Sequence, residues 1–350
     1  MTATFIRNHR RLTEQALSIQ SKVDTIAIVK NDAYNFGLFD TFTAFHKAGI
    51  RAFATTNLKE AKKLRSYDSD IMVLLLDPCT EFEEMREHEI TLSLPSYSFY
   101  QQYKDELKGL SVQLVFRNDL NRLGFTDSSK MAAVLDDASI KVNGLWTHFA
   151  YADDFQTNRH EKEINNWLGV LNDLTSYLPR LSYIHAQNSA SYITNGLMAN
   201  HTHIRGGVIL YGTRPYVGNL DLSLARQTVE VTANVIELTD IKAGESAGYS
   251  AAFTAKADTR LAVCDIGYGN GLILSRKDFP VSINGNHYPI RVMMMSHLLV
   301  EVDQSVSIGD TVNLYNDELR FDEFTERGIG SFSQQMAAFN KETFTQVDIT

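Results

Sequence analysis

Lys30 is a residue whose type and position in this sequence could do chemistry. It ends an apolar run in the segment IAIVKNDAYNFG, and that run is typical of a buried strand. In a barrel of parallel strands the carboxyl ends form the active-site face, so a lysine at this point would lie where substrates bind. Most lysines are solvated surface residues, and the position of Lys30 alone does not separate the two interpretations.

Eight short, β-rich apolar segments recur through the first two thirds of the chain, and polar or amphipathic stretches separate them. Helices are predicted in several of these stretches, for instance Leu58 to Arg65, Ser96 to Leu107 and Thr157 to Leu178. Alternating strands and helices indicate a parallel sheet, and eight repeats indicate closure into a (β/α)8 TIM barrel. The predicted strands are Thr25 to Lys30, Arg51 to Thr56, Ile71 to Leu76, Thr91 to Pro95, Ser111 to Phe116, Lys141 to His148, Tyr183 to Gln187 and His203 to Leu210.

The pattern changes after about Asp221, where strand-like segments follow one another with turn signals such as Asn284-Gly285-Asn286 between them. This predicts a smaller, C-terminal all-β domain. We place the barrel in residues 1–222 and the β domain in residues 223–350. Its predicted strands are Gln227 to Glu237, Thr259 to Ile266, Pro280 to Ile283, Tyr288 to Met295, Leu298 to Val302 and Thr311 to Tyr315.

The amino-acid composition limits the kinds of molecule that this protein is expected to bind. A net charge of −9 argues against nucleic acid or an anionic membrane, because both need a concentrated basic face, and favours a small-molecule substrate. The two cysteines, Cys79 and Cys264, cannot form a disulfide framework or a cysteine-based zinc cluster, and no metal site is expected. The amino-terminal segment lacks the apolar core of a secretion signal, and no apolar run is long enough to enter a membrane. We expect a cytoplasmic protein.

Several short motifs resemble those of the alanine racemase family, in the family's order and spacing over roughly residues 5 to 315. VKNDAYNFG at 29–37 is similar to the segment that carries the family's cofactor lysine, although Asn31, Asp32, Asn35 and Phe36 depart from it. The other matching motifs are NRLGF at 121–125, WTHF at 146–149, HAQNSA at 185–190, RGGVILYG at 205–212, GYS at 248–250 and IGYGNG at 266–271.

The resemblance implies pyridoxal 5'-phosphate as the cofactor, joined to Lys30 as a Schiff base. Lys30 and Tyr249 would be the two catalytic acid/base groups, since racemisation removes a proton from one face of the α carbon and returns it on the other. Arg205 would face the pyridine nitrogen and keep it unprotonated, and His148 would lie beside the ring. The remaining implied contacts are Tyr34, Asn188, Ser189, Gly207 and Val208 with the cofactor, Arg122 with both cofactor and substrate, and Tyr268 and Met295 with the substrate.

Each of these residues also has a purely structural interpretation. Asn188 and Ser189 could form an ordinary helix cap, His148 could be a hydrogen-bonded core histidine, and Tyr249 could be a buried core tyrosine.

The sequence departs from the family at three places. Val115 stands seven residues before Arg122, where many members carry a carbamylated lysine that braces this arginine. Ser296 replaces the aspartate beside Met295. The carboxyl-terminal Tyr-Glu and Arg-Val-Pro-Arg segments of the family are not visible, and Gln334 falls near the position of the phosphate-side tyrosine.

The resemblance implies an isomerase that interconverts L- and D-alanine and supplies D-alanine for peptidoglycan. Two alternatives stay open: a racemase of another small amino acid such as serine, and a cofactor-binding protein without racemase activity. If Tyr249 acts opposite Lys30 of another subunit, two chains must share their sites, so a homodimer is expected.

Overall fold

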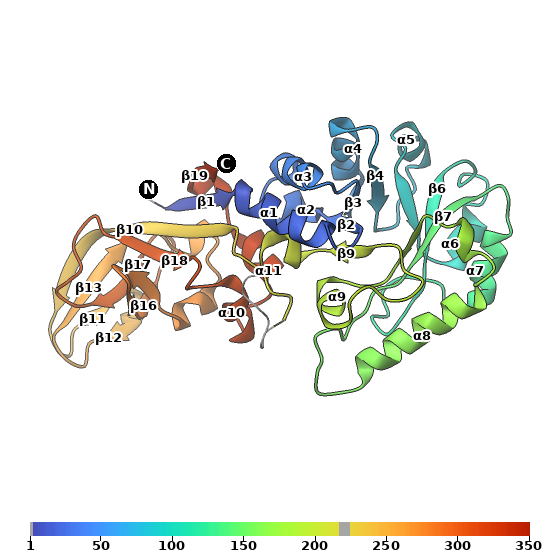
Figure 1. Ribbon diagram of the computed structural model, residues 1–350. Helices are drawn as coiled ribbons and strands as arrows, with labels where there is room; N and C mark the ends of the chain where they lie inside the picture. Colours follow the sequence, from blue (N-terminus) through green and yellow to red (C-terminus); the bar gives the residue numbers. More distant parts are fainter. Residues whose placement is uncertain (1–2, 217–224) are drawn as a thin grey trace. The chain divides into compact units, whose positions relative to one another are not determined.

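The computed structural model describes residues 3–216 and 225–350, and these form two compact units (Figure 1). One unit is Thr13–Leu210; the other contains the described residues of Met1–Leu12 together with Tyr211–Thr350. The amino-terminal segment thus groups with the second unit, which the sequence did not predict. The predicted domain boundary at residue 222 lies outside the described residues.

Thr13–Leu210 is a barrel of eight parallel strands in the order β8-β7-β6-β5-β4-β3-β2-β9. Strands such as β3 are buried at every residue, as expected where helices cover the outside of a parallel sheet. The first and last strands of this order, β8 and β9, are brought together by backbone hydrogen bonds. These run from Arg205 N to Gln187 O (2.9 Å) and from Thr202 N to Ile184 O (2.9 Å). All eight strands coincide with predicted segments: β2 (Thr25–Ile28), β3 (Ala52–Thr55), β4 (Met72–Leu75), β5 (Thr91–Leu94), β6 (Ser111–Val115), β7 (Lys141–Trp146), β8 (Tyr183–His185) and β9 (Ile204–Gly206).

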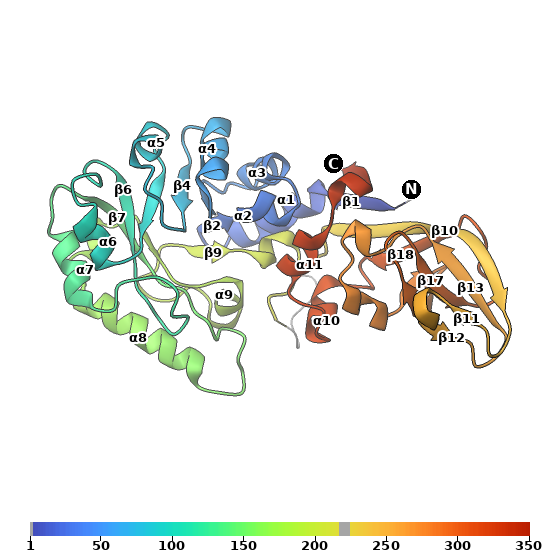
Figure 2. The same cartoon turned by 180° about the vertical axis from the view of Figure 1, so that it is seen from behind.

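The helices of this unit lie outside the barrel strands, with α3, α4 and α5 on one side and α7 and α8 on another (Figures 1 and 2). Side-chain caps start several of them. Asn57 accepts a hydrogen bond from Glu60 N (2.8 Å) at α4, and Ser96 accepts one from Phe99 N (3.1 Å) at α6. Their bounds are α1 (His9–Gln20), α2 (Lys30–Tyr34), α3 (Leu38–Lys47), α4 (Leu58–Tyr67), α5 (Phe82–Glu87), α6 (Tyr97–Gln102), α7 (Ser128–Leu135), α8 (Arg159–Asp173) and α9 (Ser189–Asn195), with short helices η1 (Leu178–Arg180) and η2 (Val208–Tyr211).

The second unit is built on a nine-stranded sheet in the order β15-β14-β18-β10-β13-β17-β16, with β1 paired to β10 and to β19. The predicted all-β domain is therefore confirmed, and short helices complete it. Its strands are β1 (Thr4–Asn8), β10 (Val229–Ile241), β11 (Ser246–Ala247), β12 (Phe253–Thr254), β13 (Thr259–Cys264), β14 (Val281–Ile283), β15 (Asn286–Tyr288), β16 (Ile290–Met293), β17 (Leu298–Val302), β18 (Thr311–Tyr315) and β19 (Thr345–Ile349). Its helices are η4 (Tyr249–Ala251), η5 (Tyr268–Asn270), η6 (Leu274–Asp278), α10 (Phe321–Glu326), α11 (Phe332–Ala338) and η7 (Lys341–Thr343).

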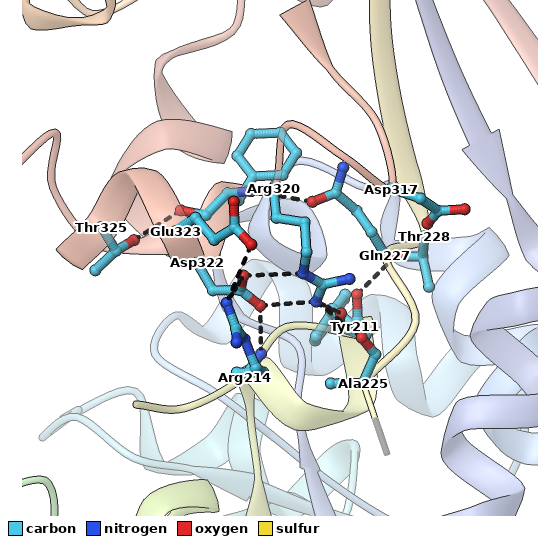
Figure 3. A network of polar contacts seen from close by, with 12 residues as sticks. Tyr211, Arg214, Ala225, Gln227, Thr228, Asp317, Arg320, Asp322, Glu323 and Thr325 are labelled. Atoms are coloured by element: carbon cyan, nitrogen blue, oxygen red, sulfur yellow. Dashed lines mark hydrogen bonds and ion pairs between the residues drawn. The ribbon is translucent and has the colours of Figure 1, made fainter. Parts of the chain in front are cut away.

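A buried ion network joins three segments of this second unit (Figure 3). Asp322 accepts hydrogen bonds from Arg320 Nη2 (2.7 Å) and from both the backbone N–H (2.9 Å) and Nη2 (3.0 Å) of Arg214. Arg320 Nη2 also donates to the carbonyl of Ala225 (2.8 Å). Burial favours the neutral form of Asp322, but the two arginines outweigh it and lower the pKa of this carboxyl. The network ties Arg214, just after η2, to Asp322 at the start of α10.

No helix within residues 3–216 and 225–350 has the length and apolar character needed to cross a membrane. Over the same residues, no group of three or more His, Cys, Asp or Glu side chains is arranged to hold a metal ion.

Candidate active site

Lys30 follows β2 at the carboxyl end of the barrel strands, where the sequence placed it. The preceding residue, Val29, donates its N–H to Ala54 O (2.9 Å), which holds this end of β2 against β3. Partial burial and the positive charge of Arg122 lower the pKa of Lys30, while Asp77 acts in the opposite direction. A lysine with a lowered pKa supplies a neutral amine at a smaller cost, as both a nucleophile and a proton acceptor require.

The backbone after Lys30 forms a left-handed turn. Five successive residues, Asn31 to Asn35, have φ between 52° and 68°, a region that costs a residue with a side chain about 1–2 kcal/mol. Hydrogen bonds from Ala33 N to Val29 O (3.0 Å) and from Gly37 N to Asp32 O (3.0 Å) close the turn. Strain on this scale persists only where surrounding contacts fix the conformation.

Tyr34 lies at the end of this turn and is buried, which raises the pKa of its phenol. Its hydroxyl lies near Ser189 and Gly207: a Cβ placed on Gly207 would come within 3.4 Å of Tyr34 Oη and 3.8 Å of Ser189 Oγ. Ser189 Oγ accepts hydrogen bonds from Gly207 N (3.2 Å) and Ile209 N (3.4 Å). The structure therefore brings together three of the residues assigned to the cofactor, around a point where a glycine leaves space.

Asn188 forms a helix cap, the structural alternative to a cofactor-binding role. Its Oδ1 accepts a hydrogen bond from Ser191 N (3.0 Å) and so caps α9, while its Nδ2 donates to Phe149 O (3.3 Å). Val208, the next predicted residue, begins η2 directly after Gly207.

Arg205, on β9, is buried within the barrel and pairs with no acidic side chain in the described part of the chain. Its two terminal nitrogens donate instead to His185 Nδ1 (2.7 Å) and His148 Nδ1 (2.8 Å). Nη2, which bonds His148, also donates to the carbonyls of Thr147 (2.7 Å) and Ala186 (2.8 Å). Burial, with a smaller effect of Arg122, lowers the pKa of Arg205 to about 9. The site thus holds a positive charge that no carboxylate neutralises.

The two histidines that accept from Arg205 are neutral. Because Arg205 donates to their Nδ1 atoms, the ring proton of each lies on Nε2. In His185 this proton is donated to Gln113 Oε1 (2.8 Å). Burial, the charge of Arg205 and, for His148, the charges of Arg122 and Lys30 hold the pKa of both rings well below the usual value. Arg205 contacts His148 directly, Arg122 and His148 line one cavity, and Lys30 and His148 both follow the carboxyl ends of barrel strands.

Arg122 lies in an exposed loop between β6 and α7. A small cavity beside it is lined by Val115, the residue at the position of the family's bracing lysine, and by Trp146 and His148. Asn118, in the same loop, donates from Nδ2 to Glu163 O (2.8 Å). The loop is therefore tied to α8.

Three residues of the predicted site belong to the β unit. Tyr249, in η4, is 81% exposed, and its neighbour Ser250 has φ 53°. Tyr268 and Met295 are also exposed, and their segments are joined by hydrogen bonds from Tyr268 N to Met294 O (3.0 Å) and from Gly269 N to Met295 O (2.8 Å). Tyr268 and Met295 therefore share one surface of this unit, and Tyr249 is not the buried core tyrosine that was the alternative.

Sequence reasoning assigned no role to three residues that support the site. Gln113 and His185 form the buried chain of hydrogen bonds behind Arg205. Glu163, fully buried on α8, accepts the N–H groups of Ala150 (2.8 Å) and Tyr151 (3.0 Å), just after His148. A polar glutamine inside the apolar strand SVQLV was a usable signal, whereas Glu163 lies among other polar residues of α8 and gave none.

Comparison with known proteins agrees with this architecture. Residues 2–215 match the model of the alanine racemase N-terminal domain, and residues 228–348 match that of the C-terminal domain. Alanine racemase 2 of Staphylococcus aureus (strain Mu50 / ATCC 700699) is 41% identical over 352 residues, which cover 98% of this chain and 97% of that protein. An alanine racemase of Streptococcus mutans is 26% identical over 311 residues, or 86% of this chain and 82% of that protein.

Solved structures show the same fold. The alanine racemase of Bartonella henselae, solved with covalently bound pyridoxal phosphate, superimposes with a TM-score of 0.88 at 21% identity and full coverage of both chains. The biosynthetic alanine racemase of Pseudomonas aeruginosa gives a TM-score of 0.86 at 24% identity, covering 99% of each chain. The two domain matches, in the order and at the positions of the two structural units, show that this chain belongs to the alanine racemase family.

Proposed function

We propose that this protein interconverts L- and D-alanine with pyridoxal phosphate bound covalently to Lys30. The observation that carries the proposal is the uncompensated Arg205 cation, held by two neutral histidines on the same barrel face as Lys30. The similarity to a protein named alanine racemase 2 over nearly its whole length supports the choice of alanine. A neighbour of the same fold carries covalently bound pyridoxal phosphate.

The residues present fit this cofactor. The space at Gly207, bordered by the hydroxyls of Tyr34 and Ser189, suits a phosphate, because hydroxyls and backbone N–H groups bind anions and a side chain would occupy the space. The cofactor would have its phosphate at Gly207 and would be joined to the Lys30 amine at the other end of the left-handed turn. Arg205 would then face the aromatic ring.

The cofactor, when bound, delocalises the negative charge that forms when the α proton leaves. Lys30 moves that proton on one face of the α carbon, and burial and the charge of Arg122 lower its pKa, which favours the neutral amine that accepts a proton. Arg205 keeps its own protons at neutral pH, because even its lowered pKa of about 9 lies above neutrality. Beside the cofactor it would therefore leave the pyridine nitrogen unprotonated, which would disfavour side reactions such as transamination.

Tyr249 is the proposed acid/base group for the opposite face, supplied by the β unit of a second copy of this chain. Its exposure in the single chain makes it available to such a partner. The proposed assembly is a homodimer with two shared sites. Arg122 would bind the substrate carboxylate, and Tyr268 and Met295 would line the substrate pocket from the partner's side. D-alanine supply for peptidoglycan and a cytoplasmic location complete the proposal.

Turnover measurements with purified protein and added pyridoxal phosphate test this function. We expect racemisation of both alanine enantiomers, with a lower rate on serine, and its loss in Lys30→Ala. Tyr249→Phe should lose turnover and keep the bound cofactor, because Tyr249 acts only on the substrate. A protein that binds the cofactor and turns over neither amino acid would refute the proposal and favour a non-catalytic cofactor-binding role.

A further inference from the structure

We propose that Glu60 is a positioning residue that holds the left-handed turn after Lys30 in its active conformation. Its effect on the cofactor rests on the proposed function, whereas its effect on the turn does not. Glu60 belongs to α4, outside every motif assigned to the site, and both of its carboxylate oxygens have partners at the end of the barrel where Lys30 lies.

The local sequence around Glu60 would predict a different use of this side chain. Asn57 caps α4 and accepts the N–H of Glu60 (2.8 Å), and a glutamate at this spacing commonly bonds back to the cap residue. In this structure Glu60 Oε1 instead accepts the N–H of Asp32 (2.7 Å), and Oε2 accepts the hydroxyl of Thr55. The carboxylate therefore bridges two segments beyond its own helix.

Each of these two contacts fixes a different element. Asp32 is the second of the five left-handed residues, and its own Oδ1 accepts the N–H of Leu38 (2.8 Å) at the start of α3. Thr55 is fully buried at the end of β3, the strand paired with β2 through Ile28 and Ala54. Glu60 thus connects the end of β3 to the turn that follows β2.

The turn has functional groups at its two ends. Lys30 precedes its first left-handed residue, and Tyr34, whose hydroxyl lies near Gly207, is its fourth. The conformation of the turn therefore sets the separation between the amine and the phenol. A relaxed turn would displace both groups, since unsupported left-handed residues return to more favourable backbone angles.

Amide hydrogen exchange in the cofactor-free protein tests the structural part. Glu60→Ala should raise exchange over residues 29–38 by about tenfold or more, because the Asp32 N–H loses its acceptor. Glu60→Gln should stay close to the parent, since its amide oxygen can accept from Asp32 and its amide nitrogen can donate to Thr55. Thr55→Val, which keeps the shape of the side chain, should give an intermediate rise.

Glu84→Ala is the matched control, because Glu84 pairs with Lys62 on the surface (2.5 Å) and touches no part of the turn. It should leave exchange over residues 29–38 unchanged. Unchanged exchange in both Glu60→Ala and Thr55→Val would overturn the proposal. Should Glu60→Ala fail to fold, exchange over residues 29–38 in Thr55→Val and Glu60→Gln tests the proposal in its place.

Cofactor titration tests the consequence for the site. We expect the Kd for pyridoxal phosphate to rise about tenfold or more in Glu60→Ala and to stay within about threefold in Glu60→Gln. Equal affinity in Glu60→Ala and the parent would contradict the positioning role. If the parent itself does not attach the cofactor at Lys30, the proposed function fails, and the exchange measurement still decides the role of Glu60.

Discussion

His148 and His185 should make the barrel unit sensitive to mild acid. Both rings accept a hydrogen bond from Arg205 at Nδ1, so a second proton could enter only by breaking that contact beside a cation. Their pKa values are accordingly well below the usual 6.5. In the unfolded chain the same rings titrate normally and bind protons that the folded state does not bind. Stability is therefore complete above pH 6.5 and is lost as pH falls below it.

The size of the effect follows from proton linkage. Each ring that stays neutral in the folded state lowers the free energy of unfolding by about 1.4 kcal/mol between about pH 7.5 and about pH 5.5. The pair therefore lowers it by about 2.7 kcal/mol. His201 and His203, whose pKa values are also lowered by burial, act in the same direction. We expect His148→Gln, which keeps an acceptor for Arg205, to reduce the acid-induced loss by about 1.4 kcal/mol.

Urea unfolding of the cofactor-free protein, followed by tryptophan fluorescence at the two pH values, measures this loss. The chain has two tryptophans, Trp146 and Trp167, and both lie buried in the barrel, so the signal reports that unit. His287→Gln, at an exposed position of β15, is the control and should change nothing. Equal acid-induced losses of stability in His148→Gln and the parent would show that His148 is not held neutral in the folded protein.

Other substitutions test single contacts. Gly207→Ala places a methyl group 3.4 Å from Tyr34 Oη; a cofactor titration should show affinity about tenfold weaker, with little change in Tm. Arg122→Lys loses a planar, two-pronged donor, so steady-state kinetics should show the KM for alanine about tenfold higher. Asp322→Ala leaves two buried arginines without their carboxylate and should destabilise the β unit by about 3–5 kcal/mol in calorimetric unfolding.

The barrel strands were predictable because burial on both faces leaves continuous apolar runs, and all eight were found. The predicted end of β7 was too long: the sheet stops at Trp146, and His148 beyond it contacts Arg205. β1 and β19 were missed. Every residue of β19 is exposed, so no buried face distinguishes it as a strand, and it pairs with β1 from the other end of the sequence.

The site was predictable only in part. Motif resemblance singled out Lys30 and Arg205, but it gave no sign of the hydrogen bonds from Gln113 through His185 that hold Arg205. Nor does local sequence predict five left-handed residues after Lys30. Asn and Asp tolerate that conformation singly, whereas the whole turn depends on contacts from elsewhere in the barrel, such as Glu60. Tertiary contacts of this kind have no local signature.

The proposed site depends on a covalent bond between the Lys30 amine and pyridoxal phosphate. Borohydride reduction of the protein with added cofactor, followed by peptide mapping in a mass spectrometer, measures it directly. We expect a stable adduct on Lys30 that is absent in Lys30→Ala and unaffected in Lys59→Ala, a change at an exposed lysine of α4. An adduct on another lysine, or one that survives Lys30→Ala at the parent's level, would contradict it.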